Sequence, residues 1–133
     1  MADRKLTITV QDSPYESETT TTVLRIAEAA LRKGIDVTVF AYEGAVALPF
    51  RGQAPHANPV KGTTVEQQDH PNTKNFIAGL FGIGGAKFDW INCGLCVDER
   101  GMGDAVEGVR RGSPADFYKS SEESTNTLVI GTR

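Results

Sequence analysis

Both cysteines of this 133-residue chain lie in one short stretch, with Cys96 three positions after Cys93. Cys93 follows a largely apolar segment, residues 86–91, and precedes Gly94, a pattern typical of a strand that turns into a helix. Open α/β sheets bind and react at the carboxyl ends of their strands. Amide groups at a helix start favour a thiolate over a thiol. The stretch therefore predicts Cys93 as a nucleophile at a sheet edge.

Two kinds of sulfur chemistry suit this pair. Cys93 could hold sulfane sulfur as a persulfide, with the backbone amides that follow it and the Arg100 guanidinium stabilising the anion. Cys96 lies one helical turn further and could instead resolve that persulfide and form a disulfide, as in thioredoxin-like sites. The alternative for each cysteine is a small apolar residue of the core.

A zinc site is a third possibility for the two cysteines. It would need two more ligands, for which His56 and His70 are the obvious candidates. These histidines stand at no fixed spacing from the cysteines and suit ordinary solvated loop residues better. We therefore expect no metal and no organic cofactor.

Residues 12–17 follow the first predicted strand, so they should emerge at the same sheet edge as Cys93. Ser13 and Tyr15 could line a pocket there. Ser13 and Ser17 also suit turn and helix-cap roles, which place the same residue types at the same positions.

Alternating and helical periodicities predict one α/β domain across residues 1–133, with a mostly parallel sheet of about five strands and helices on both faces. The short turn at Gly34 between the first helix and the second strand implies a parallel, right-handed crossover. The predicted strands are 5–11, 35–42, 86–92, 105–111 and 128–131, and the predicted helices are 17–33, 43–50, 73–82, 95–100 and 113–123.

Residues 51–72 are polar, rich in Gly, Pro, Gln and His, and lack either periodicity. A loop of this length is uncommon inside a compact domain unless it covers a site or contacts a partner. A tolerated surface insertion explains it equally well.

Composition narrows the class of protein. A hydrophobic content of 39% and a charged content of 23% are typical of globular chains. The net charge of −3 disfavours a nucleic-acid partner, and the absence of an apolar run of roughly 20 residues disfavours a membrane span. The first residues lack the apolar region of a secretory signal, so we expect a cytoplasmic protein, in which a structural disulfide is disfavoured.

Several short segments, in this order and at this spacing, are similar to those of the DsrE/DsrF-like family, which includes the sulfur-relay subunits DsrE and TusD and has a YchN-like α/β fold. In its sulfur-relay members the persulfide-forming cysteine stands eight residues before the glycine of an Arg-Gly pair, a position that Cys93 occupies relative to Gly101. The segments that carry the resemblance are 13–18, 24–31, 34–37, 43–46, 93–101, 107–109 and 112–113.

The resemblance implies a sulfur-relay protein or sulfurtransferase that carries sulfane sulfur on Cys93, with a protein donor and a protein acceptor. It also implies a homo-oligomer, a trimer or hexamer. Two other functions stay open: a thiol-disulfide redox protein that uses Cys93 with Cys96, and a non-catalytic binding module of the same fold that binds a ligand or partner through residues 51–72.

Overall fold

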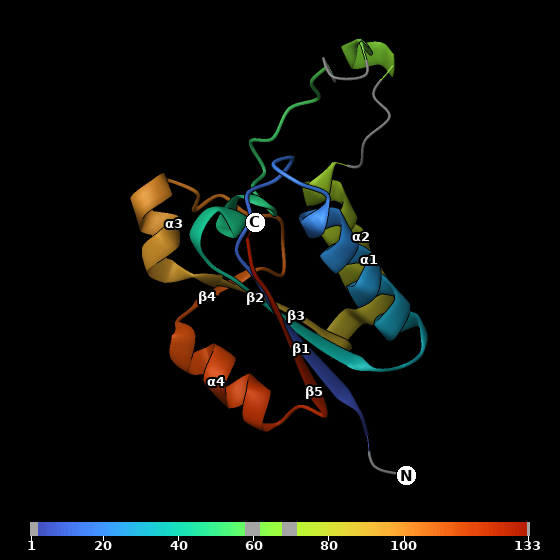
Figure 1. The fold of residues 1–133 in the computed structure, drawn as a ribbon, viewed down its shortest axis with the longest axis vertical. Helices are drawn as coiled ribbons and strands as arrows, with labels where there is room; N and C mark the ends of the chain where they lie inside the picture. Colours follow the sequence, from blue (N-terminus) through green and yellow to red (C-terminus); the bar gives the residue numbers. More distant parts are fainter. Residues whose placement is uncertain (1–2, 58–61, 68–71, 133) are drawn as a thin grey trace.

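Five parallel strands form one sheet in the order β4-β3-β2-β1-β5 (Figure 1). The structure is a computed structural model that describes residues 3–57, 62–67 and 72–132. The all-parallel sheet bears out the fold class expected from the sequence. The strands are β1 (Lys5–Val10), β2 (Asp36–Ala41), β3 (Phe88–Cys93), β4 (Arg110–Gly112) and β5 (Asn126–Ile130).

Helices cover both faces of the sheet, with α1 and α2 side by side on one face and α3 and α4 on the other (Figure 1). Among the described residues, no helix is both long and apolar enough to cross a bilayer. The α-helices are α1 (Thr19–Arg32), α2 (Thr73–Gly84), α3 (Gly94–Arg100) and α4 (Pro114–Glu122); short 3-10 helices are η1 (Glu43–Ala47), η2 (Val65–Gln67) and η3 (Gly85–Lys87).

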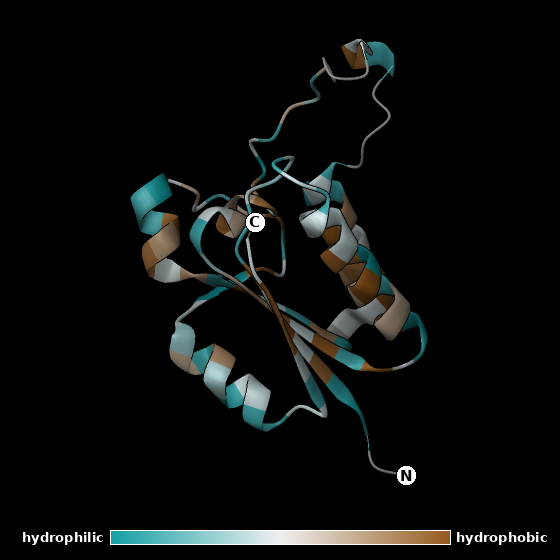
Figure 2. Cartoon of the chain, viewed as in Figure 1, coloured by the Kyte–Doolittle hydropathy of each residue, from teal (hydrophilic) through white to brown (hydrophobic). Residues whose placement is uncertain are grey.

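The larger part of the core lies between the sheet and the α1–α2 pair, where Leu24, Ile77 and Trp90 are completely buried. Hydrophobic residues gather along the strands and on α1 and α2, whereas α4 is mostly polar (Figure 2). A second, smaller apolar cluster lies on the opposite face of the sheet, and both cysteines belong to it. Its buried members are Phe40, Val46, Ile91, Cys93, Cys96 and Val97.

Local sequence signals explain where several helices begin and end. Ser113 and Asp116 form a capping box at the start of α4, with a proline at the first turn, as the Ser-Pro pair predicted. The Asn72 side chain caps α2. Gly101 ends α3 with a left-handed φ of 64°, a conformation that glycine adopts at low cost.

Two predicted elements differ from those in the structure. The strand expected at 105–111 is only the three-residue β4, Arg110–Gly112. Gly108 interrupts the extended backbone with a φ of 100°, and Ala105 instead forms an isolated antiparallel bridge with Phe50. The helix expected at 43–50 is the tighter 3-10 helix η1, which ends at Ala47.

The described parts of the 51–72 segment project away from the sheet (Figure 1). η2 is the regular element within them. Residues 58–61 and 68–71 of this predicted loop, including His70, lie outside the described residues.

Candidate functional site

Cys93 is the last residue of β3 and the N-cap residue of α3, so the predicted junction between strand and helix is present. It pairs with Gly112 of the neighbouring β4 strand. Cys93 is 7% exposed, so little of the residue reaches solvent. Gly94 is the first residue of α3 and is buried.

Cys96 lies on the inner face of α3, 9% exposed, and its Sγ accepts a hydrogen bond of 3.1 Å from the Glu43 N–H. Burial raises the pKa of the Cys96 thiol, while the Glu43 amide acts in the opposite direction; the neighbouring Cys93 sulfur and the Glu43 charge raise the pKa further. Cys96 therefore holds its proton to a higher pH than an ordinary cysteine does.

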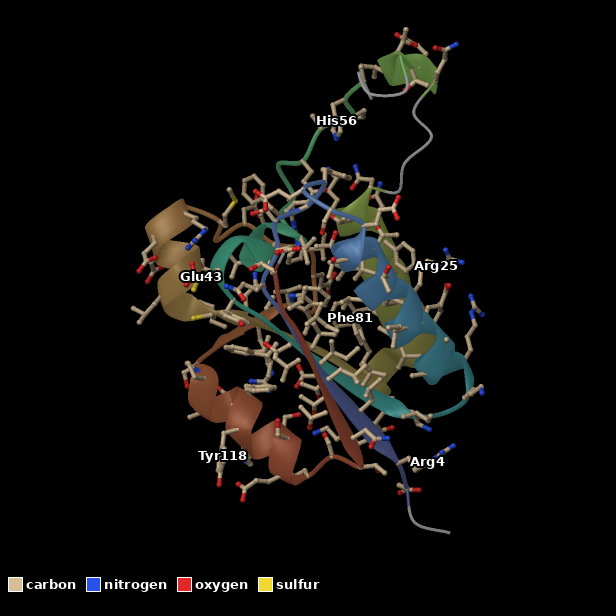
Figure 3. All side chains as sticks on the ribbon, in the orientation of Figure 1. Arg4, Arg25, Glu43, His56, Phe81 and Tyr118 are labelled. Atoms are coloured by element: carbon tan, nitrogen blue, oxygen red, sulfur yellow. The ribbon has the colours of Figure 1, made fainter. Side chains whose placement is uncertain are left out.

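Glu43 starts η1 in a left-handed backbone conformation, with a φ of 51° that is uncommon for a residue other than glycine. Its carboxylate accepts a hydrogen bond of 2.8 Å from the Arg100 guanidinium. Glu43 lies beside α3 in Figure 3. One turn thus brings a backbone donor to the Cys96 sulfur and a carboxylate to the last turn of α3.

Arg100 is the residue predicted to stabilise the sulfur anion. Its guanidinium contacts two carboxylates and one carbonyl oxygen. Besides Glu43, it contacts Glu99 at 3.5 Å and the Cys96 carbonyl oxygen at 3.5 Å. These hydrogen bonds connect Arg100 to the backbone and rim of α3 rather than to either sulfur.

A cleft of about 360 Å³ opens beside the two cysteines, over the carboxyl ends of β1, β2 and β3. Aromatic rings form much of its wall, with Phe40 stacked between Tyr42 and Phe117 at centroid distances of 6.1 and 5.8 Å. No Lys, Arg or His of the described chain is among the lining residues. Those residues are Thr9, Phe40, Tyr42, Glu43, Cys93, Cys96, Pro114, Phe117 and Val129.

Ser13 and Tyr15, predicted to line a pocket, lie elsewhere at this edge. A β-carbon at Gly44 would collide with the Ser13 hydroxyl oxygen, so Ser13 packs directly against the turn that carries Glu43. The Tyr15 hydroxyl accepts a hydrogen bond from the Thr73 N–H at the start of α2, and its ring meets His56 edge-on. Neither residue lines the cysteine cleft among the described residues.

Arg111 is a residue near Cys93 that the sequence did not single out. Its guanidinium donates two hydrogen bonds, of 2.8 and 3.0 Å, to the Asp98 carboxylate on α3. It also lies 3.3 Å from the carbonyl oxygen of Gly94, the residue after Cys93. These hydrogen bonds from Arg111 lower the pKa of Asp98, and the Asp98 carboxylate together with the Cys93 charge raises the pKa of Arg111.

The cleft wall contains further residues that sequence reasoning passed over, namely Tyr42, Phe117 and Val129. Phe117 lies on the predicted final helix, but its inward orientation depends on how α4 packs. Val129 is 68% exposed on β5 and reaches the cleft because β5 pairs with β1, where Val129 is the register partner of Thr9.

In the described ranges, no group of three or more His, Cys, Asp or Glu side chains is arranged to hold a metal ion. His56, one of the two proposed zinc ligands, contacts Tyr15. His70 is outside the described residues.

Comparisons with known proteins agree with this architecture. An uncharacterized protein of Methanopyrus kandleri is 30% identical over 94% of this chain and 93% of its own length. Another, of Methanocaldococcus jannaschii, is 26% identical over 95% of this chain and 99% of its own length. The crystal structure of the E. coli YchN protein has the same fold, with a TM-score of 0.74 at 23% identity, covering 96% of this chain and 99% of YchN.

A conserved protein of unknown function from Bacteroides thetaiotaomicron also has this fold, with a TM-score of 0.60 at 16% identity over 95% of this chain and 94% of that one. The sequence pattern of the DsrE/DsrF-like family matches residues 4–129, which include every helix described above, β1 to β4, and β5 up to Val129. The chain therefore belongs to the DsrE/DsrF-like family.

Proposed function

We propose that this protein carries sulfane sulfur as a persulfide on Cys93 and acts in a sulfur relay. The observation that carries the proposal is the position of the Cys93 thiol, at the carboxyl end of β3 and on the wall of a cleft that also contains Cys96. Family membership supports the same chemistry, because it relates the fold to sulfur-relay proteins.

The transfer needs no metal, cofactor or oxidant. The Cys93 thiolate attacks the outer sulfur of a donor persulfide, the S–S bond of the donor breaks, and the donor leaves as a thiolate. Cys93 then carries an S–SH group. An acceptor thiolate attacks that outer sulfur, takes it, and returns Cys93 to the thiolate.

The different surroundings of the two sulfurs support Cys93 as the attacking group. Cys96 lies on the side of the Glu43 carboxylate and has a raised pKa, which keeps it a neutral thiol. Cys93 lies on the side of the Arg111 cation. A thiolate is the nucleophilic form of cysteine, so the raised pKa of Cys96 disfavours attack by Cys96 and leaves Cys93 as the attacking group.

Mass spectrometry of the intact protein after incubation with cysteine persulfide tests the proposal. We expect the wild type and the Cys96→Ser variant to gain one sulfur atom, located on Cys93 in peptide maps. The matched Cys93→Ser variant should gain none. Unimpaired loading of Cys93→Ser would overturn the proposal.

A second candidate function is thiol-disulfide exchange, which the proximity of Cys93 and Cys96 favours, since Cys93 is close enough to raise the pKa of Cys96. The Cys96 thiolate would attack the inner sulfur of the Cys93 persulfide, release hydrosulfide and form a disulfide, which an external dithiol would then reduce. In the same experiment, an internal disulfide in the wild type that is absent from both single variants supports this function.

The proposal takes a protein donor, a protein acceptor and a homo-oligomer as its context, with the cytosol as the compartment because a reducing environment keeps both thiols free. A protein that shows neither a gained sulfur nor a disulfide would instead be a binding module of this fold. Size-exclusion chromatography with light scattering tests the oligomer separately from the chemistry.

A further inference from the structure

We propose that the cysteine that exchanges sulfur with Cys93 belongs to a polypeptide segment whose neighbouring side chains are uncharged and apolar. This inference rests on the proposed function and names its partner chemistry. It follows from three properties of the cleft: its lining, its charge balance and the strand at its rim.

The lining of the cleft is apolar apart from Thr9, Glu43, the two thiols and the hydroxyl of Tyr42, which donates to the Gln11 side chain. Rings and aliphatic groups cannot replace the water that a charged side chain loses on entry, and an unpaired charge in such a place is strongly disfavoured. A volume of about 360 Å³ suits a cysteine side chain with one apolar neighbour.

The charged residues around the cleft do not offer a counter-ion to a charged side chain that enters it. Arg100 and Arg111, the cations described near the cysteines, each contact a carboxylate, with Arg100 at Glu43 and Arg111 at Asp98. Glu43 itself lines the cleft, so an incoming carboxylate meets a residue of like charge there. An anionic carrier such as an acidic peptide therefore gains no counter-ion on entry.

The rim of the cleft favours a polypeptide over a small molecule. β5 is the terminal strand of the sheet and pairs with β1 along one edge, so its other edge presents backbone donors and acceptors of the kind that an extended peptide pairs with. Val129 of this strand lines the cleft and is 68% exposed. A segment lying along β5 thus borders the cleft at its Val129 end, while Cys93 on β3 lies at the other end, with β1 and β2 between them.

Two blocked tripeptides test the proposal, each carrying a persulfide on its cysteine: N-acetyl-Phe-Cys-Phe-amide and N-acetyl-Asp-Cys-Asp-amide. We expect initial loading of Cys93, followed by mass spectrometry in the Cys96→Ser variant, to be at least about tenfold faster with the apolar peptide, the factor that corresponds to 1.4 kcal/mol. Equal rates would overturn this inference and leave the proposed function standing. Loading by neither peptide, in protein that cysteine persulfide does load, would overturn this inference alone, whereas failure of cysteine persulfide as well would overturn the proposed function.

Val129→Lys provides the second measurement, since it adds a cation at an exposed position on the rim. It should reduce the preference for the apolar peptide several-fold by favouring the acidic one. The matched control is Thr127→Lys, on the same face of β5 but outside the cleft lining, and it should leave the ratio unchanged. An equal effect of both lysines on the ratio of loading rates would show that the cleft lining does not set the preference, which overturns this inference. A small-molecule donor, benzyl persulfide, tests the polypeptide: loading faster than that by the apolar peptide would overturn the polypeptide assignment.

Discussion

The backbone N–H of Glu43 lies 3.1 Å from the Sγ of Cys96, although the two residues are 53 positions apart in the chain. The contact joins the end of β2 to the first turn of α3 and gives the buried sulfur a hydrogen-bond donor. The same residue lines the cleft, and its carboxylate accepts a hydrogen bond from Arg100. Glu43 therefore acts on Cys96 in two opposite ways, through its amide and through its charge.

Removal of the Glu43 charge separates these two effects. Glu43→Gln keeps the backbone amide and abolishes a charge that raises the pKa of Cys96, so the pKa should fall. In a Cys93→Ser background, alkylation of Cys96 followed against pH should shift to lower pH. Glu99→Gln removes another carboxylate that contacts Arg100 and is the matched control, for which no shift is expected. A shift of equal size in both variants would contradict this assignment.

Arg111→Gln should slow the reaction of Cys93. The guanidinium lies against the Gly94 carbonyl, and Arg111 interacts by Coulomb attraction with negative charge on the Cys93 sulfur. We expect alkylation of Cys93 at neutral pH, in a Cys96→Ser background, to slow by about two- to fivefold, the size that a solvated charge pair supports. Arg110→Gln is the control, because Arg110 makes an equivalent pair with Asp89. The role of Arg111 fails if both variants slow Cys93 equally.

The contact between Asp98 and Arg111 should make folding stability depend on acid pH. Hydrogen bonds from Arg111 lower the pKa of Asp98 below its ordinary 3.8. The contact therefore contributes fully above that value, and its contribution is lost as the pH falls through the lower pKa of the folded state. Urea midpoints of the wild type and Asp98→Asn should differ near neutral pH and converge in acid. A difference independent of pH would show that the carboxylate charge is not involved.

Asn92→Ala should destabilise the fold next to the site. Asn92 is 2% exposed; it accepts a hydrogen bond of 2.9 Å from the Trp90 indole and donates one of 3.1 Å to the Val46 carbonyl. The substitution leaves both buried partners unsatisfied, at a cost of about 2 to 4 kcal/mol. Urea denaturation measures the loss. The exposed Asn126→Ala should change stability by less than about 0.5 kcal/mol, and similar losses in the two variants would exclude the buried hydrogen bonds as the cause.

Local patterns were sufficient to predict the elements that hold Cys93. The strand before it, the helix after it and the cap at Ser113 depend on neighbouring residues and all appear in the structure. The strand expected at 105–111 was mostly wrong, because Gly108 and the pairing of Ala105 with Phe50 shorten it to Arg110–Gly112.

The rest of the site depends on contacts between distant segments, which no local pattern contains. The sequence suggested Arg100 as a cation that stabilises the sulfur anion. The register of β3 and β4 also pairs Arg111 with Asn92, one residue before Cys93, and brings the Arg111 guanidinium to Gly94. Val129 likewise reaches the cleft only because β5 lies beside β1.

The close packing of Ser13 against Gly44 matters to anyone who wishes to redesign this edge of the protein. A methyl group at position 44 would collide with the Ser13 side chain and lie 3.2 Å from its backbone nitrogen. Side chains in the connection after β1 therefore limit which residues fit in the connection after β2. A library that randomises one of these two connections must vary the other with it. Loop grafts from relatives should accordingly be exchanged in pairs.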